Sequence, residues 1–304
     1  MKTENTALKN TENILIVGLG LIGGSYAKAL TKQGFRVRAV TKRQEDIDYA
    51  VEHGFLAEGD TAVRTDWLGE ADIVVLALYP HTLIDWVTQN GKYLRAGTLV
   101  TDVTGVKGSI IETVQNAMPQ GVEFIAAHPM AGRERSGVQY SDDSVFHGAN
   151  YIMVPNGRNS QEAICKCEAL GEALGFYRIS RLDAATHDRM IAFLSQLTHC
   201  IAVSLMCASD VPGMEAYTGD SFRDLTRIAR INDEMWSELF LWNRDALLAE
   251  MDRFAAQFDH LRTALAEGDR EEMRRMMRLS GERREKFDRP AAKDVLWSEG
   301  GENK

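Results

Sequence analysis

The sequence of 304 residues is poor in cysteine and proline and has no excess of basic residues. Its four cysteines are Cys165, Cys167, Cys200 and Cys207, and neither a second close pair nor neighbouring histidines complete a zinc-ligand pattern. We therefore expect no metal site and reduced thiols that pack in the interior. The net charge of -9, with scattered lysines and arginines, argues against a nucleic-acid partner.

Long apolar runs are also lacking. We find no run of the roughly 18 residues needed to cross a bilayer, and the polar start MKTENTALKNTEN has no apolar centre of a signal peptide. These absences predict a soluble cytoplasmic protein without a membrane partner. Only Pro212 lies between Pro155 and Pro290, which favours long uninterrupted helices in the second half.

Two kinds of hydrophobic pattern divide the chain. From Asn13 to about Ser180, apolar runs of strand length alternate with helical patterns: ILIVGL, a helix over 24–33, FRVRAV, ADIVVLALY, GTLVTDV, VEFIAAH and NYIMVP. This alternation predicts an α/β fold, a Rossmann-type doubly wound parallel sheet over residues 1–181. Helical periodicity then predicts an all-α domain over residues 182–304. Because so few helical residues make a thin core, we expect a homodimer formed through this domain.

A glycine motif follows the first predicted strand. GLGLIG runs from Gly18 to Gly23 and opens a helical pattern. Gly18 permits a tight turn, Gly20 lets the backbone approach a pyrophosphate, and Gly23 allows close helix packing. The phosphates would meet free N–H groups at the helix start, around Leu21 and Ile22. We predict a dinucleotide site here; the alternative is a glycine-rich turn without a ligand.

The end of the second predicted strand bears on the choice of cofactor. An NAD-preferring fold usually places a carboxylate there to bind the ribose 2′-hydroxyl. This chain instead has Thr41, Lys42 and Arg43, which supply a hydroxyl and two positive charges suited to a 2′-phosphate. NADP is therefore favoured over NAD. An ordinary solvated loop, with Glu45 or Asp46 reaching the ribose, is the alternative.

His128 ends the run VEFIAAH, and the segment DVTGVK ends the run GTLV. Substrates of such folds bind beyond the carboxyl ends of the strands, so both segments are expected to line one crevice. A neutral imidazole there could accept the proton of a substrate hydroxyl. A hydrogen-bonded structural histidine is the alternative, but the glycines and charges of the following loop, HPMAGRERSG, favour a site.

Five motifs together resemble one family. GLGLIGGS, DVTGVK, HPMAGRERSGV, LSQLTH and FRDLTRIA, the last followed by Trp236, are similar to the prephenate and arogenate dehydrogenases of tyrosine biosynthesis. The resemblance runs from about Asn13 to Phe258. It implies a nucleotide-binding domain, a helical dimerisation domain, and a His128 that hydrogen-bonds the C4 hydroxyl of prephenate and assists its deprotonation. It also implies that His199 and Arg227 contact substrate.

Other candidates are less direct. Arg223 would share a helical face with Arg227 and add a cation, unless both arginines pair with Asp220 or Asp224. Glu134 could offer an anion to the ammonium group of arogenate, while Arg133 beside it would oppose this. His199 could equally be a satisfied core histidine.

The chain departs from the family at one position. Many members carry a serine where this chain has Gly105, so a hydroxyl close to His128 is missing. Thr104 could supply that hydroxyl from next door, a water could replace it, or activity could be lower. We therefore include Thr104 among the catalytic candidates, and the loss of one donor would slow the enzyme without abolishing its chemistry.

Several functions remain open from the sequence. The first is prephenate dehydrogenase; arogenate or dual-specificity dehydrogenase is the near alternative. Others are an unrelated Rossmann dehydrogenase, a catalytically silent NADP-binding regulator, which Gly105 would favour, and a structural dimerisation protein. Tyrosine inhibition, if it occurs, would have to be competition at the active site, since no room remains for a sensing domain.

Overall fold

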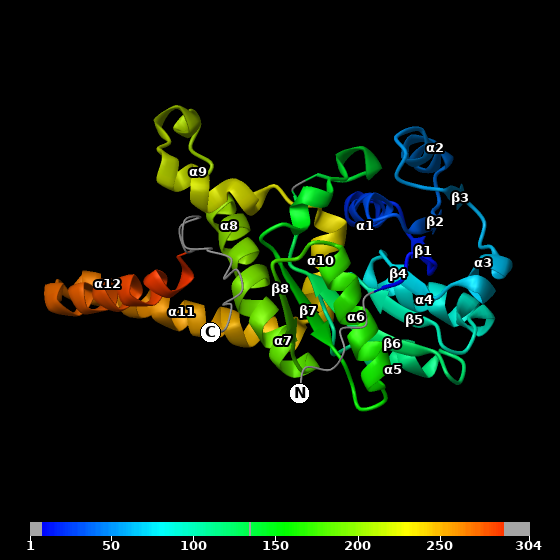
Figure 1. The fold of residues 1–304 in the computed structure, drawn as a ribbon. Helices are drawn as coiled ribbons and strands as arrows, with labels where there is room; N and C mark the ends of the chain where they lie inside the picture. Colours follow the sequence, from blue (N-terminus) through cyan, green and yellow to red (C-terminus); the bar gives the residue numbers. More distant parts are fainter. Residues whose placement is uncertain (1–7, 134, 289–304) are drawn as a thin grey trace, which may run out of the picture. The chain divides into compact units, whose positions relative to one another are not determined.

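The computed structural model describes residues 8–133 and 135–288, and Figure 1 presents the fold. The chain forms two compact units, residues 1–248 and 249–304. The last strand ends at Arg181 and the next helix begins at Ala184. The division into domains at residues 181 and 182 stays a prediction.

The first unit is built on an eight-stranded sheet in the order β3-β2-β1-β4-β5-β6-β7-β8. The strands are β1 (Asn13–Val17), β2 (Arg36–Val40), β3 (Glu58–Asp60), β4 (Ile73–Leu76), β5 (Leu99–Asp102), β6 (Glu123–Pro129), β7 (Asn150–Val154) and β8 (Arg178–Arg181). Strands β1 to β6 pair in parallel, with β1 between β2 and β4. The predicted Rossmann-type architecture is therefore confirmed.

The sheet differs from the prediction at its edges. Strand β7 is antiparallel to β6, placing His128 opposite Ile152, and β8 is parallel to β7. The sheet is therefore not parallel throughout. Strands β3 and β8 were not predicted because the sequences EGD and RISR carry no apolar run; their partly exposed edge positions do not require one.

Side chains alternate between the two faces of the sheet. Ile14 and Ile16 of β1 pack with α1 (Leu21–Lys32), α2 (Gln44–Glu52) and α6 (Gln161–Ala173), while Leu15 and Val17 pack with the helices of the opposite face. Those are α3 (Thr65–Glu70), α4 (Pro80–Asn90) and α5 (Ile111–Asn116). Both faces are thus buried, as the continuous apolar strands require.

Helices follow β8 through the rest of the described chain. They are α7 (Ala184–Ile191), α8 (Leu197–Cys207), α9 (Asp220–Thr226), α10 (Asp233–Trp242), α11 (Arg244–Glu267) and α12 (Arg270–Arg284), with single turns at η5 (Met214–Tyr217), η6 (Arg227–Ala229) and η7 (Glu285–Phe287). In the sheet region, η1 (Gly91–Tyr93), η2 (Val138–Tyr140) and η3 (Asp143–Phe146) complete the elements. The helical second half is confirmed for residues 182–288.

Helices α7 and α8 are joined by a π-helical turn, η4 (Ala192–Gln196). A π turn inserts one residue, so the twelve-residue spacing between His187 and His199 behaves like eleven, or about three turns. Both histidines therefore lie close to one face of the continuous helix, roughly 17 Å apart along its axis.

The segment Ala184–Cys207 is long enough to span a bilayer, and the most apolar part of it has a mean hydropathy of 1.7. Only 28% of that apolar part is buried inside the protein. The helix lies in the half of the chain predicted to be helical, but a segment long and apolar enough to span a bilayer was not expected from the sequence. It carries exposed Met190, Phe193, Leu194 and Met206 but contributes only Ala192 and Leu197 to a small core with Leu247. The helical part of the first unit thus leaves a large apolar surface open.

The second unit contains the rest of α11, from residue 249, and α12. Gly268, with a φ of +70°, ends α11, and Asp269 accepts a hydrogen bond from the backbone N–H of Glu272 to begin α12. His260 of α11 contacts Glu272 at 2.9 Å. Phe258 and Leu265 on α11 are largely exposed, so this unit also has an unburied apolar face.

Candidate active site

The glycine loop has the geometry that a dinucleotide needs. Gly18 has a φ of +98°, and an added Cβ would lie 2.4 Å from the carbonyl oxygen of Ala77. A Cβ on Gly23 would lie 2.0 Å from the carbonyl oxygen of Gly18, whereas one on Gly20 would meet nothing within 4 Å. Gly18 and Gly23 are thus fixed by packing, and Gly20 faces open space.

Gly20 is also the N-cap of α1, and no side chain caps this end of the helix. Its first turn contains Leu21 and Ile22 and no acidic residue. Free N–H groups and a partial positive charge are therefore available to an anion. The residues fit a dinucleotide pyrophosphate, as the sequence predicted.

The end of β2 lies against the glycine loop. Thr41 Oγ1 accepts a hydrogen bond from the backbone N–H of Leu19 at 3.3 Å, and its own O–H remains able to donate. Lys42 and Arg43 are exposed. Arg43 makes loose ion pairs with Glu45 at 3.4 Å and Asp46 at 3.6 Å. Glu45 is exposed beside the basic residues, whereas Asp46 is mostly buried.

His128 lies near the carboxyl end of β6 and is partly exposed. The backbone N–H of Ala127, just before it, donates to Asp102 Oδ1 at 2.9 Å. Its Nδ1 lies 3.0 Å from Nε2 of His187. One ring nitrogen is thus engaged inside the protein, and the residue as a whole is partly exposed.

The expectation that the whole DVTGVK segment lines the crevice is wrong. Asp102 and Lys107 are fully buried and form an ion pair at 2.6 Å. Lys107 Nζ also donates to the carbonyl oxygen of Thr104 at 2.9 Å and to its Oγ1 at 3.1 Å. All three ammonium hydrogens are used, so this network is an internal support for β5 and β6.

Thr104 belongs to that support, which corrects its assignment as a catalytic candidate. Its hydroxyl is buried and lies between Asp102 Oδ2, the carbonyl oxygen of Val106 at 2.9 Å, and Lys107 Nζ. Its single hydrogen already has two acceptors and the residue is buried, so it does not offer a free donor in place of the missing serine hydroxyl.

Gly105, by contrast, is beside the candidate base. A Cβ at this position would lie 3.8 Å from Cε1 of His128 and 3.7 Å from Leu239, both ordinary contact distances. The backbone therefore leaves room for a side chain next to the imidazole, and the protein has none there.

His199 and Arg227 lie on neighbouring elements of the helical half. His199 stacks on Trp236 with ring centroids 3.7 Å apart, and its Nδ1 contacts the carbonyl oxygen of Ser195 at 2.9 Å. Arg227 is the first residue of η6, which packs against α8. The structure thus brings together the two motifs that the resemblance assigned to substrate binding.

The two remaining candidates are not supported in the same way. Arg223 lies on α9 as expected but forms an exposed pair with Asp220 at 3.1 Å and donates to Thr218. Asp220 therefore competes with a substrate carboxylate for the Arg223 guanidinium, which is the alternative considered from the sequence. Glu134 lies outside the described residues.

The loop after β6 is tied to the start of α1. Arg133 contacts Asp142 at 2.6 Å, and hydrogen bonds from Ser144 and this arginine lower the pKa of Asp142 to about 2. The backbone N–H of Asp142 donates to Ser25 Oγ, and Lys28 Nζ donates to the carbonyl oxygen of Ser141 at 2.6 Å. The loop that follows the candidate base is thus anchored beside the glycine motif.

Two residues near His128 were missed from the sequence, His187 and Asp188 of α7. His187 is completely buried, and its Nδ1 lies 2.8 Å from Asp188 Oδ1. A histidine in an apolar helix looks like a core residue. The adjoining acid, in the sequence THD at the start of that helix, was the available signal for a functional pair.

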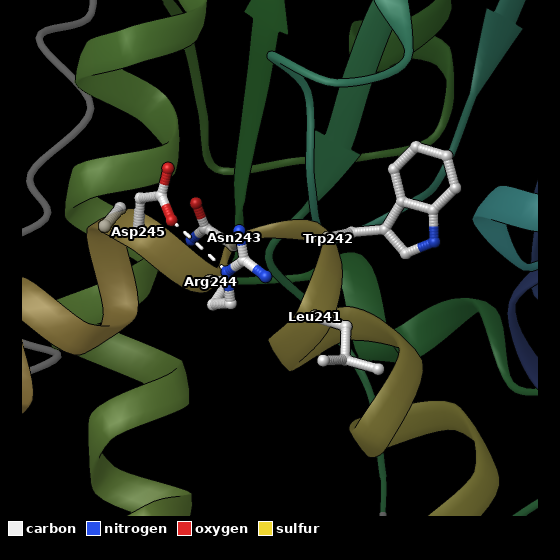
Figure 2. A pocket seen from close by; sticks show the side chains of 6 residues that line it. Leu241, Trp242, Asn243, Arg244 and Asp245 are labelled. Carbon is white, nitrogen blue, oxygen red and sulfur yellow. Dashed lines mark hydrogen bonds and ion pairs between the residues drawn. The ribbon is translucent and has the colours of Figure 1, made fainter.

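Figure 2 shows a separate open cavity of about 180 Å³ at the break between α10 and α11. Its lining includes Arg244, paired with Asp245 at 3.3 Å, and Asn243. The buried Asn243 amide donates to the carbonyl oxygen of Asp188 and to Gln196 Oε1. This helix break, which the sequence did not predict, therefore supports α7.

The environment of His128 gives a pH expectation. Burial of most of the ring, and the nearby His187 and Lys107, lower its pKa well below the usual 6.5. A base must be neutral to act, and a lowered pKa keeps it neutral to lower pH. We expect the acidic limb of the kcat profile to fall below about pH 6.5. A limb above that value would assign the titration to another group.

Comparisons with known proteins agree with the fold. A model of the prephenate dehydrogenase nucleotide-binding domain matches residues 26–176, and a model of the prephenate dehydrogenase dimerization domain matches residues 183–279. Cyclohexadienyl dehydrogenase from Zymomonas mobilis is 30% identical over 267 residues, 85% of this chain and 90% of that protein.

Solved structures give the same result. Prephenate dehydrogenase from Aquifex aeolicus, in complex with hydroxyphenyl propionate and NAD+, has a TM-score of 0.85 and 27% identity, covering 93% of this chain and 100% of that one. Synechocystis arogenate dehydrogenase has a TM-score of 0.79 and 26% identity, covering 91% and 100%. The chain belongs to the prephenate and arogenate dehydrogenase family of nicotinamide-dependent oxidoreductases.

Proposed function

We propose that this protein catalyses the oxidative decarboxylation of prephenate to 4-hydroxyphenylpyruvate, with hydride transfer to a nicotinamide dinucleotide. The observation that carries the proposal is the partly exposed His128 near the carboxyl end of β6, with Nδ1 engaged inside the protein. A histidine held in this way has one nitrogen left to meet a substrate hydroxyl.

The residues divide the chemistry as follows. Gly18, Gly20 and Gly23 hold the dinucleotide, which when bound supplies the hydride acceptor. His128 accepts the C4 hydroxyl proton as hydride leaves C4, and the ring carboxylate departs as carbon dioxide. The phenolic oxygen then regains the proton. Aromatisation drives the reaction, so the protein mainly orients C4 and polarises its hydroxyl.

The carboxylates of the substrate are assigned to the helical half. Arg227 can donate two parallel hydrogen bonds to a carboxylate, and His199 lies on the helix that η6 packs against. The π turn supports this assignment, since it places His199 near the same helix face as His187, which contacts His128.

Arogenate, or both substrates, is the second candidate. The observation in its favour is the 30% identity to a cyclohexadienyl dehydrogenase. Arogenate differs in carrying an ammonium group in place of the keto group; Arg133 in the loop after His128 would oppose that cation, but this arginine is already paired with Asp142. We keep prephenate first because both matching family models are those of prephenate dehydrogenase.

One assay tests both candidates. Purified protein is mixed with NAD or NADP and with prephenate or arogenate, and reduction of the nicotinamide is followed by absorbance. Turnover with prephenate supports the proposal, and turnover with arogenate alone replaces it by the second candidate. Failure of all four combinations, with dinucleotide binding intact, would favour a silent regulator, for which the empty position beside His128 at Gly105 is the structural argument.

We propose NADP as the preferred dinucleotide, because the charges at the end of β2 suit a 2′-phosphate. Replacing Lys42 and Arg43 by glutamine should raise the Kd for NADP by about 10-fold or more, through the loss of charge-assisted hydrogen bonds, and leave the Kd for NAD nearly unchanged. Titration of protein fluorescence with each dinucleotide measures both constants.

The matched control removes two positive charges at the amino-terminal side of strands β2 and β5, away from the strand ends that meet the glycine loop. Arg36 begins β2, and Lys92 lies in η1, shortly before β5. The double variant Arg36→Gln, Lys92→Gln should leave both dissociation constants unchanged. Equal weakening of NAD and NADP by the Lys42 and Arg43 variant would refute the 2′-phosphate assignment.

We propose that the protein is a homodimer through the helical half. The support is the match to a dimerization domain over residues 183–279 and the exposed Met190, Phe193 and Leu194 of the α7 and α8 helix. Burial of these side chains against a second copy would account for the apolar character of that helix without a bilayer. A cytoplasmic location stays a prediction.

A further inference from the structure

His187 contacts the candidate base, His128, on the side of its Nδ1 atom. Its side chain is completely buried on α7, and its Nε2 lies 3.0 Å from Nδ1 of His128. The two rings are 5.2 Å apart between centroids and tilted by 60°. The contact is a hydrogen bond between two imidazoles, in which one nitrogen must donate and the other must accept.

Asp188 determines which nitrogen of His187 carries hydrogen. Its Oδ1 accepts from the backbone N–H of Lys107 at 2.9 Å, and its Oδ2 accepts from that of Gly108 at 2.7 Å. Both oxygens thus act as acceptors on a rigid backbone. Because His187 Nδ1 lies 2.8 Å from Oδ1, this nitrogen must carry the hydrogen and donate it.

The remaining assignments follow in order. A neutral His187 with hydrogen on Nδ1 has a bare Nε2, which can only accept. His128 Nδ1 must then donate to it, so Nε2 of His128 is bare. The opposite tautomer of His128 would place two lone pairs against each other, and reversing His187 as well would turn a lone pair towards the Asp188 carboxylate.

We propose that Asp188 and His187 are positioning residues that fix the tautomer and orientation of His128, so that its Nε2 lone pair faces the substrate hydroxyl. The role of that lone pair as the base rests on the proposed function; the tautomer itself does not. After proton transfer, the imidazolium still donates from Nδ1 to His187, and the carboxylate of Asp188 lies behind the pair.

Two surrounding features agree with neutral rings. Burial lowers the pKa of His187 despite its hydrogen bond to Asp188, and the pKa of His128 is lowered by burial, His187 and Lys107. The charged groups facing the pair are Lys107, Asp102 and Asp188, and Lys107 is neutralised by Asp102. Asn243 holds the backbone of Asp188 from the α10–α11 break.

The first test reads the tautomer in the free protein. Histidine labelled with ¹⁵N is incorporated, and the signals of His128, one of seven histidines, are assigned by their loss in His128→Asn. We expect Nδ1 of the pyrrole type and Nε2 of the pyridine type. In His187→Leu this single tautomer should be lost. A hydrogen on Nε2 in the native protein, or an unchanged tautomer in His187→Leu, would overturn the proposal.

The second test is kinetic. His187→Leu should lower kcat about 10- to 100-fold with KM and dinucleotide Kd within about 3-fold, because orientation and proton transfer are affected and binding is not. His187→Gln should recover much of the loss, since its amide oxygen can accept from Nδ1. His53→Leu, at the exposed end of α2, is the matched control.

The two proposals fail in different ways. If the native protein turns over neither substrate but His128 shows the expected tautomer, the proposed function fails and the positioning role stands. If the native protein is active and His187→Leu, folded by circular dichroism, keeps its kcat, the positioning role fails. A loss in His187→Gln as large as in His187→Leu would also contradict it, because the acceptor would then not be what matters.

Discussion

His128→Asn is expected to lower kcat by about 100-fold or more, the size of effect that follows loss of a general base. Asparagine can still hydrogen-bond, but its amide does not take up a proton in the accessible pH range. The Kd for the dinucleotide should change little, because the glycine loop that holds it is built from β1, α1 and the end of β4. Steady-state kinetics and a binding titration measure the two effects.

The change is expected in kcat and kcat/KM together, since the proton transfer is made only in the transition state. His147→Asn is the matched control, because this exposed histidine follows η3 and lies outside the described contacts of His128. An unchanged kcat in His128→Asn would remove this histidine from the mechanism. A rise in KM alone would make it a binding residue.

The parts of the site that the sequence predicted are those with local patterns. GLGLIG directly after an apolar strand predicts the turn at Gly18, where a positive φ demands glycine, and the open approach at Gly20, where a ligand and not the protein backbone requires the space. His128 was found because parallel strands present their carboxyl ends at one edge of the sheet. Each inference needed only the order of neighbouring residues.

The parts that were missed depend on distant contacts. His187 is 59 positions from His128, and nothing in its apolar helix indicates which residue lies against it. The π turn at Ala192–Gln196 has no sequence signal of its own, yet it sets the relation of His187 to His199. Strand β7 pairs antiparallel with β6, and no α-helix lies between them in the chain. The apolar run of β7 predicts a strand but does not indicate the direction in which that strand pairs.

Contacts between distant residues also explain why the prediction that DVTGVK lines the crevice was wrong for its two ends, Asp102 and Lys107. A polar segment at a strand end predicts a crevice, and Gly105 does lie beside His128. Asp102 and Lys107 instead satisfy each other inside the sheet, where Asp102 also accepts from the backbone of Ala127. A lysine at the end of such a segment is expected to be exposed until its three hydrogen-bond acceptors are known.

Lys107→Met is expected to lower the free energy of unfolding by about 3–5 kcal/mol, because it leaves the charge of Asp102 buried and uncompensated. Burial lowers the pKa of Lys107, and the attraction of Asp102 opposes that shift. Each charge of the pair therefore depends on the other to remain ionised in the interior. Lys32→Met is a close control: Lys32 and Asp143 also lie 2.6 Å apart, but the lysine side chain is 65% exposed instead of fully buried. Its loss should cost no more than about 1 kcal/mol.

Urea denaturation of the three proteins measures the difference, and the double variant Asp102→Asn, Lys107→Met tests its cause. Because the double variant leaves neither member of the buried ion pair charged, its loss of stability should be smaller than the sum of the losses in the two single variants. Equal losses for Lys107→Met and Lys32→Met would contradict the argument from burial. Because Asp102 holds the backbone beside His128, the buried pair links the stability of the sheet to the placement of the base, and Lys107→Met should therefore also lower kcat at temperatures where it remains folded.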